Sequence, residues 1–186
     1  MGAQIRVYIA SSLDGFIAGP KDELDWLGDP TPDAGLPDNI IGFERFISDV
    51  GAMVMGRGTY DVVSRFDPPW FYGNLPILVP THRPLSPVVP SVRAVAGTID
   101  EVLDDALRLA DGKDVYVDGG ATIRQALDAG RIDEIVLTIA PVLLGRGKPL
   151  FAGLEQRHHI DIVSHRDYGR GMMQLIARPV GSYLRT

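Results

Sequence analysis

The stretch VYVDGGATIRQAL, residues 115–127, joins a short apolar run to a segment with helical spacing through two adjacent glycines. The apolar run is typical of a buried strand, and the spacing after Gly120 predicts a helix. Glycine has no Cβ, so a phosphate or a flat ring can approach the backbone closely at this junction. Gly119 and Gly120 could therefore help to hold a pyrophosphate, whereas the alternative is a tight turn that needs glycine only for its dihedral angles.

The segment GRGT, residues 56–59, repeats this arrangement after the buried run AMVM. Arg57 is suited to pairing with a phosphate. Thr59 could cap the following helix and donate to a phosphate oxygen. The alternative is again a capped turn, with an arginine that faces solvent.

A third predicted strand, PILVP at residues 76–80, is followed by Thr81, His82 and Arg83. These three side chains would add hydrogen-bond donors and a cation. Parallel strands end at the same edge of a sheet, which is where open α/β sheets bind ligands. The three strand ends together therefore predict a dinucleotide site, although none of them matches a G-x-G-x-x-G fingerprint or a P-loop.

Predicted strands and helices alternate along the chain up to Gly130, and strand-like runs follow one another after it. Asp38 would cap a helix that runs to about Val50, and Thr98 and Glu101 would form a capping box at the start of the clearest helix. YGRG, residues 168–171, is typical of a hairpin turn. This order predicts one α/β domain over residues 1–186, with a mostly parallel sheet and antiparallel strands added at its end.

The composition excludes several classes of function. There is no cysteine, which excludes disulfides, thiolate metal sites and a cysteine nucleophile. The net charge is -6 and no basic block is present, which argues against a nucleic-acid partner. No apolar run approaches the ~20 residues of a membrane helix, and the N-terminal segment is typical of a first strand rather than a signal peptide. We expect a cytoplasmic protein.

Five segments carry a resemblance to a known family: SLDGFIAG, DWL, AMVMGRGTY, VYVDGGATI and APVLLGRGKPLF. In this order they resemble the dihydrofolate reductase superfamily, and more closely its branch with the RibD C-terminal domain, the reductase domain of the bacterial riboflavin pathway. The resemblance implies a dihydrofolate reductase-like α/β fold with a central, mostly parallel mixed sheet of about eight strands flanked by helices. It also implies bound NADPH and a homodimer, in which the C-terminal strands could supply the interface.

The resemblance assigns cofactor-binding roles by position. Its candidates are Ala10 and Ile17 at the nicotinamide; Gly56, Arg57 and Thr59 at the pyrophosphate or adenosine phosphate; Thr81 and His82, with Arg83, near the ribose 2′-phosphate; and Gly119, Gly120, Thr122 and Ile123 at the pyrophosphate and nicotinamide. A basic residue near the 2′ position, with no acidic residue just after PILVP, favours NADPH over NADH.

Reduction of a C=N or C=O group also needs a proton, which a carboxylic acid with a raised pKa can supply. Glu44 lies between Ile40 and Ile47 on one line of the predicted helix; it is either partly desolvated there or faces water. Asp14, in the SLDG loop, is beside the expected nicotinamide or belongs to a simple Asp–Gly turn. Asp61 is the third candidate, and its alternative role is a favourable charge near a helix N-terminus.

The leading hypothesis is an NADPH-dependent reductase of a small planar N-heterocycle, either a pterin or a ribosylaminopyrimidine. Trp26, Phe43, Tyr60 and Trp70 could wall its pocket or could instead anchor the core and loops. The alternative hypothesis is a nucleotide-binding sensor or scaffold that has lost catalysis.

A strand near the C-terminus raises the possibility of a metal site. Simple alternation places His159, Asp161 and His165 on one face of the run RHHIDIVSHR, where they could ligate zinc. A solvated strand face explains the same residues, and we predict no metal. GRGK, residues 145–148, precedes proline rather than serine or threonine and is interpreted as a turn.

Overall fold

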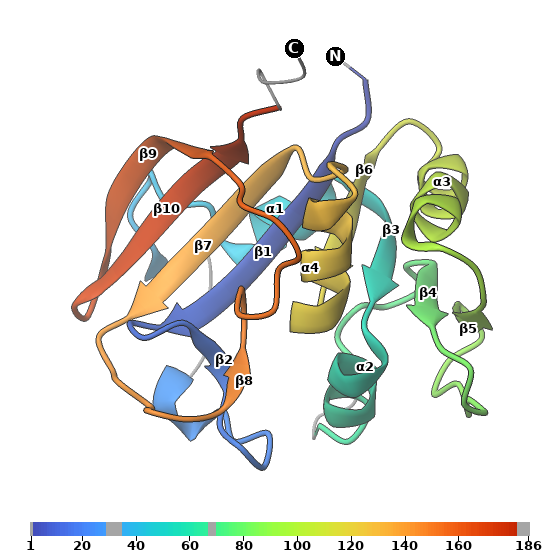
Figure 1. Ribbon diagram of the computed structural model, residues 1–186, viewed down its shortest axis with the longest axis horizontal. Coiled ribbons are helices and arrows are strands. Elements are labelled where there is room, and N and C mark those ends of the chain that lie inside the picture. Colours follow the sequence, from blue (N-terminus) through green and yellow to red (C-terminus); the bar gives the residue numbers. More distant parts are fainter. Residues whose placement is uncertain (1, 29–34, 67–69, 182–186) are drawn as a thin grey trace.

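The computed structural model describes residues 2–28, 35–66 and 70–181. Eight strands form the main sheet in the order β5-β4-β3-β6-β1-β7-β10-β9 (Figure 1). They are β1 (Ile5–Ser12), β3 (Val50–Met55), β4 (Ile77–Pro80), β5 (Val92–Val95), β6 (Asp114–Asp118), β7 (Glu134–Ala140), β9 (Ile160–Gly169) and β10 (Met172–Pro179).

The sheet is parallel from β5 to β7, and β10 is antiparallel to both β7 and β9. The hairpin between β9 and β10 turns through Gly169, Arg170 and Gly171, which all have positive φ angles. Helical crossovers favour parallel neighbours, whereas a short hairpin can only join antiparallel strands. The predicted α/β sheet, mostly parallel with antiparallel C-terminal strands, is therefore confirmed.

Helices cover both faces of the sheet. The helices α3 (Ile99–Ala110) and α4 (Gly120–Asp128) bury their apolar residues in one core, and α1 (Phe43–Ser48) and α2 (Arg57–Val63) bury theirs in the other. Figure 1 shows α4 in front of the central strands and α1 behind them. Every helix in the described part of the chain is too short or too polar to span a bilayer.

The capping box predicted at the start of α3 is present. The Glu101 N–H donates to the Thr98 hydroxyl at 3.3 Å, and the Thr98 N–H donates to the Glu101 carboxylate at 2.8 Å. These two bonds satisfy backbone donors that would otherwise lack a partner in the first turn. The start of α3 is therefore fixed by local sequence.

The first helix is shorter than the sequence predicts. It begins at Phe43 after Gly42, with no side-chain cap, so the predicted cap at Asp38 is wrong. The buried amide of Gln174 accepts from the Ile41 N–H and donates to the Ile41 carbonyl oxygen, both at 2.9 Å. These long-range bonds hold Ile41 outside the helix, and the far end of the predicted helix, Val50, belongs to β3.

A two-stranded sheet of β2 (Phe16–Ala18) and β8 (Lys148–Pro149) lies beside the carboxyl end of β1. The short helix η1 (Asp25–Leu27) follows β2. The segment before β8 forms the predicted turn, and a Cβ at Gly147 would lie 2.2 Å from the Ala18 carbonyl oxygen. Glycine is therefore required where the two segments cross.

A buried ionic network lies at the opposite, amino-terminal edge of the parallel strands. The guanidinium of Arg6 donates to Glu134 at 2.8 and 3.1 Å and to Asp114 at 3.1 Å, and it lies 4.9 Å from the centre of the Phe46 ring. Arg178 donates to the other Glu134 oxygen at 3.0 Å. The network ties β1, β6, β7 and β10 together.

Replacing Arg6 with alanine would leave the Glu134 and Asp114 carboxylates without their main partner. We expect the Arg6→Ala change to lower the free energy of unfolding by about 3 kcal/mol, because the buried Glu134 carboxylate would keep only Arg178 and Asp114 would lose the guanidinium. Arg131 is the matched control, since it also binds two carboxylates but in a more exposed position. Arg131→Ala should cost about 1 kcal/mol or less. Urea unfolding measures both changes, and equal losses would contradict this view of the network.

Candidate active site

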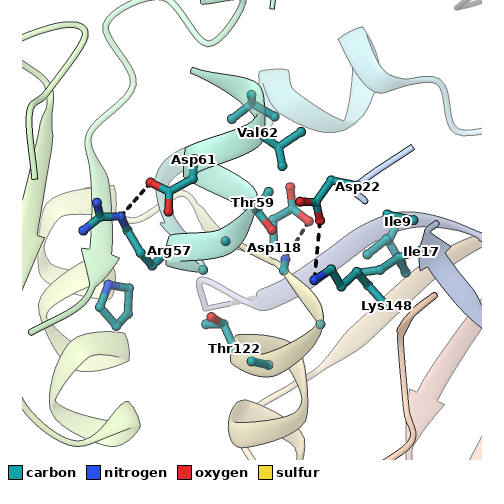
Figure 2. Close-up of a pocket in the computed structure, with 18 of the residues that line it drawn as sticks. Ile9, Ile17, Asp22, Arg57, Thr59, Asp61, Val62, Asp118, Thr122 and Lys148 are labelled. Carbon is teal, nitrogen blue, oxygen red and sulfur yellow. Dashed lines mark hydrogen bonds and ion pairs between the residues drawn. The ribbon is translucent and has the colours of Figure 1, made fainter. Parts of the chain in front are cut away.

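The carboxyl ends of the parallel strands open into one cavity of about 1000 Å³ (Figure 2). Residues at or just after the ends of β4, β5 and β6 line it, together with the first turns of α2 and α4. The small β2–β8 sheet and the carboxyl half of β1 complete the wall. Because the strands are parallel, segments far apart in the sequence meet at this edge.

Two glycine turns, GRGT and DGGAT, pack directly against each other in this wall. A Cβ at Gly56 would lie 2.8 Å from the Thr122 hydroxyl oxygen, and a Cβ at Gly119 would lie 2.7 Å from the Thr59 hydroxyl oxygen. The Gly56 N–H donates to the Asp118 carbonyl oxygen at 2.8 Å. Any larger residue at either glycine would force the turns apart, so the close approach requires both glycines.

The first turn of α4 presents open backbone donors beside the cavity. Its N-cap, Gly119, has a φ of 96° and provides no side-chain cap. The first N–H groups of a helix have no partner within the helix and carry partial positive charge. Gly120, Ala121 and Thr122 all line the cavity. This arrangement suits an anion such as a pyrophosphate.

Arg57 links α2 to the loop that follows β4. Its guanidinium donates to Asp61 at 2.7 Å, to the Thr81 hydroxyl at 3.3 Å and to the carbonyl oxygens of Arg83 and Pro84 at 3.2 and 3.0 Å. Burial acts to raise the pKa of Asp61, but hydrogen bonds and charges from Arg57 and Arg83 outweigh it and lower that pKa. Asp61 is thus an ion-paired carboxylate and a poor proton donor.

The cavity brings together nearly all the residues that the sequence assigns to the cofactor. Those on its wall are Ala10, Ile17, Gly56, Arg57, Thr59, Thr81, His82, Gly119, Gly120 and Thr122.

Ile123 and Arg83 do not line the cavity. Ile123 is fully buried in the core beneath α4, because the helical repeat turns it toward the sheet. Arg83 donates to Asp61 at 3.1 Å. The predicted capping role of Thr59 is also wrong, since α2 begins at Arg57 after Gly56 and has no side-chain cap.

Asp14 occupies a structural position outside the cavity wall. Its carboxylate accepts from the Ser12 hydroxyl at 2.6 Å and from the N–H groups of Leu144 and Gly145 at 3.1 and 2.7 Å. The bond from Ser12, with those from the backbone, lowers the pKa of Asp14. The carboxylate ties the turn after β1 to the segment before β8, and this geometry does not favour the predicted proton-donating role.

Glu44, the other predicted acid, is exposed and does not line the cavity. The sequence placed it on an apolar stripe from Ile40 to Ile47. Because α1 begins only at Phe43, Ile40 lies outside the helix and no such stripe exists. Phe46 is the buried residue of α1, and Glu44 faces water.

Asp118 is a functional candidate that the sequence did not reveal. It is the last residue of β6, and Figure 2 shows its side chain among those that line the cavity. Burial raises the pKa of Asp118 to about 6, although the Gly119 N–H, which donates to the carboxylate at 2.7 Å, favours the charged form. The sequence does show that an aspartate ends a buried strand immediately before two glycines. It does not show that the folded chain surrounds this carboxyl and raises its pKa.

The aromatic wall also differs from the prediction. Of the four predicted aromatics only Phe43 lines the cavity; Tyr60 is buried in the core, and the indoles of Trp26 and Trp70 donate to nearby carbonyl oxygens. Aromatic residues from other segments line the cavity instead. They are Tyr8, Phe66, Phe71, Tyr72 and Tyr116.

The predicted single face of His159, Asp161 and His165 is wrong, because β9 contains an irregularity. Asp161 pairs with Arg178 and His165 pairs with Leu175, with a register shift between them. Cross-strand partners share a face, and Arg178 and Leu175 are three residues apart, so Asp161 and His165 lie on opposite faces. Within residues 2–28, 35–66 and 70–181, no cluster of three or more histidine, aspartate or glutamate side chains could hold a metal ion.

Comparisons with known proteins agree with this architecture. The family model described as RibD C-terminal domain matches residues 3–174. A putative riboflavin biosynthesis protein from Shewanella sp. PV-4 is 32% identical, with a TM-score of 0.81 over 96% of this chain and 99% of that one.

Two further proteins are similar to this chain at lower sequence identity. The uncharacterized protein YyaP of Bacillus subtilis is 29% identical over 93% of both chains. Dihydrofolate reductase from Enterococcus faecalis, solved with NADP(H), is 15% identical, with a TM-score of 0.61 over 97% of this chain and 100% of that one. At that identity the likeness shows a shared fold.

The raised pKa of Asp118 predicts a specific dependence of stability on pH. Between the ordinary pKa of 3.8 and about 6, the unfolded chain releases this proton while the folded chain keeps it. The Asp118 contribution to stability therefore falls as pH rises through this interval and is constant above it. In urea unfolding between pH 4 and 7, Asp118→Asn should gain stability relative to the wild type up to about pH 6.

Asp14→Asn is the matched control, because its pKa is shifted the other way. A lowered pKa contributes stability above the ordinary pKa and loses it as pH falls. Asp14→Asn should therefore be most destabilising at neutral pH and least in acid. If the change in stability depended on pH in the same way for both variants, the opposite pKa shifts of Asp14 and Asp118 would be contradicted.

Proposed function

Because the chain belongs to the RibD C-terminal domain family, we propose that it is an NADPH-dependent reductase of a small planar N-heterocycle. One observation carries the proposal: the open first turn of α4 and the carboxyl of Asp118 face the same cavity. The first feature suits the diphosphate of a dinucleotide, and the second suits proton transfer to a substrate. The two substrate candidates are a pterin and a ribosylaminopyrimidine.

The cavity wall has complementary positions for the parts of NADPH. Gly120, Ala121 and Thr122 offer their backbone to the diphosphate. Ile17 lies against Gly120, where a Cβ would come within 3.2 Å of its Cδ1, and the nicotinamide would lie beside Ile17 and Ala10. His82 is exposed after β4, where its donor groups would meet a ribose 2′-phosphate. When bound, the reduced nicotinamide would supply a hydride to an electrophilic carbon of the substrate.

Asp118 would supply the proton that accompanies the hydride. A carboxyl with a pKa of about 6 retains a protonated fraction near neutral pH and can also regain a proton from solvent. The proton would pass to the nitrogen or oxygen of the double bond that is reduced. Aspartates with lowered pKa values, such as Asp14 and Asp61, are much weaker donors at this pH.

We also propose that the reductase is a cytoplasmic homodimer with contacts through β9. This strand lies at the edge of the sheet, where its outer backbone groups can pair with a second strand. Ile160, Ile162 and Val163 are 40%, 59% and 50% exposed. Light scattering on a size-exclusion column would measure the mass, and a monomer at micromolar concentration would refute the dimer.

Cofactor binding can be tested at His82, which is exposed and lines the cavity. We expect the wild type to bind NADPH in a fluorescence titration. His82→Glu should weaken NADPH about tenfold more than NADH, because the new carboxylate would repel a 2′-phosphate. His82→Gln introduces a polar side chain without a carboxylate, so the change in Kd should differ less between NADPH and NADH than in His82→Glu. No binding of NADPH by the wild type would remove the proposed function.

The catalytic role of Asp118 can be tested with Asp118→Asn, which keeps the shape of the side chain. We expect kcat to fall by about 10²–10⁴, the usual contribution of a general acid, with little change in the Kd for NADPH. In the wild type the rate should decline as pH rises above about 6, since the acid form is required.

Glu44→Gln, at an exposed position away from the cavity, is the matched control and should retain kcat. Full activity in Asp118→Asn would reject the proposed acid. Binding of NADPH without its oxidation across pterins and ribosylaminopyrimidines would favour the alternative, a nucleotide-binding sensor or scaffold.

A further inference from the structure

One half of the cavity is an aromatic surface. It consists of Tyr8, Phe43, Phe66, Phe71, Tyr72 and Tyr116, and we call it the aromatic half. Ring centres are 5.7 Å apart for Tyr8 and Phe43, 6.1 Å for Phe43 and Phe71, and 4.3 Å for Phe71 and Tyr72. Tyr72 and Tyr116 are only 7% and 3% exposed and lie beneath this surface. The rings that a flat ligand can contact are the more accessible ones, Tyr8, Phe43, Phe66 and Phe71.

Most of the basic side chains on the cavity wall already bind other groups of the protein or are assigned to the cofactor. Arg57 is bound to Asp61 and to the loop after β4, as described above. Arg124 donates to the carbonyl oxygens of Pro149 and Leu150 at 2.8 and 3.1 Å. His82 lies at the end of β4, which the proposed function assigns to the cofactor.

Two further cations line the described part of the cavity, and acidic groups balance them. The Lys148 ammonium lies 3.9 Å from the carboxylate of Asp22, and Arg65 is exposed. Asp118 adds a second carboxyl to this region. Among the described residues, the two carboxyls of this part of the wall therefore offset its two cations.

A phosphate group needs charged donors or open backbone N–H groups to replace its hydration. Next to apolar rings and carboxylates, a phosphate with two negative charges would lose hydration and meet like charge. A planar heterocycle without phosphate would bury its rings against the aromatic half and could direct a ring N–H toward Asp118.

We infer that the aromatic half binds a planar heterocycle that carries no phosphate group and discriminates against its phosphorylated counterpart. The inference rests on the proposed function for the assignment of the other half to the cofactor. It distinguishes between the two substrate candidates, since it favours a pterin or a dephosphorylated ribosylaminopyrimidine over a sugar phosphate.

A matched pair of ligands tests the inference directly. The probes are 5-amino-6-(ribosylamino)uracil and its 5′-phosphate, titrated by calorimetry with and without saturating NADP⁺, an oxidised cofactor that cannot react. We expect the phosphate-free compound to bind at least about tenfold more tightly, because it avoids the desolvation of the phosphate. Tighter binding of the phosphorylated compound, or no binding of either, would overturn the inference.

A variant with an added cation provides a second measurement. Phe66 is 37% exposed at the edge of the aromatic half, so a longer polar side chain can reach water there. Phe66→Arg should reduce the ratio of the Kd for the phosphorylated ligand to the Kd for the phosphate-free ligand by about tenfold, and added salt should weaken this effect. Phe66→Leu is the matched control without charge and should keep the preference. An unchanged preference in Phe66→Arg would contradict the electrostatic explanation.

The NADPH titration separates this inference from the proposed function. If NADPH binds and the phosphorylated ligand is preferred, the reductase stands and the substrate class is wrong. If NADPH does not bind while the phosphate-free ligand is still preferred, the proposed function fails and the preference of the aromatic half remains.

Discussion

The contact between the turns at Gly56 and Gly119 is the constraint on which the site depends. A side chain at either position would collide with the threonine of the other turn, and the Gly56 N–H is bonded to the Asp118 carbonyl oxygen. The contact fixes the starts of α2 and α4 relative to each other. It therefore holds one wall of the cavity in a single geometry, in which the open N–H groups of α4 and the carboxyl of Asp118 share one space.

Charge is distributed around this contact in two different ways. On the side of α2 and β4, Arg57 and Asp61 neutralise each other and hold the loop after β4 in place. Within the described residues no cation pairs with the Asp118 carboxyl, and burial raises its pKa to about 6. A dinucleotide and a proton-transfer step need these different environments within one cavity, which is why we interpret the site as that of a reductase.

Sequence patterns predicted the fold and most of the residues that line the cavity, but not its enclosed carboxyl. The capping box at Thr98 and the glycine turns act through neighbouring residues, so local sequence reveals them. The short α1 depends on Gln174, more than a hundred residues away, which bonds the backbone of Ile41 just before the helix. Asp14 likewise binds the backbone of Leu144 and Gly145, a contact that no local pattern predicts.

The sequence by itself determined the alternation of strands and helices, the glycine turns that end the central strands, and the edge of the sheet where they meet. These features follow from hydrophobic periodicity and from the backbone freedom of glycine, which are local properties. Only the tertiary structure decided which carboxyl is enclosed and which is paired. The pKa of an aspartate depends on the groups that surround it in space, so Asp118, Asp14 and Asp61 differ although each is an aspartate close to a turn.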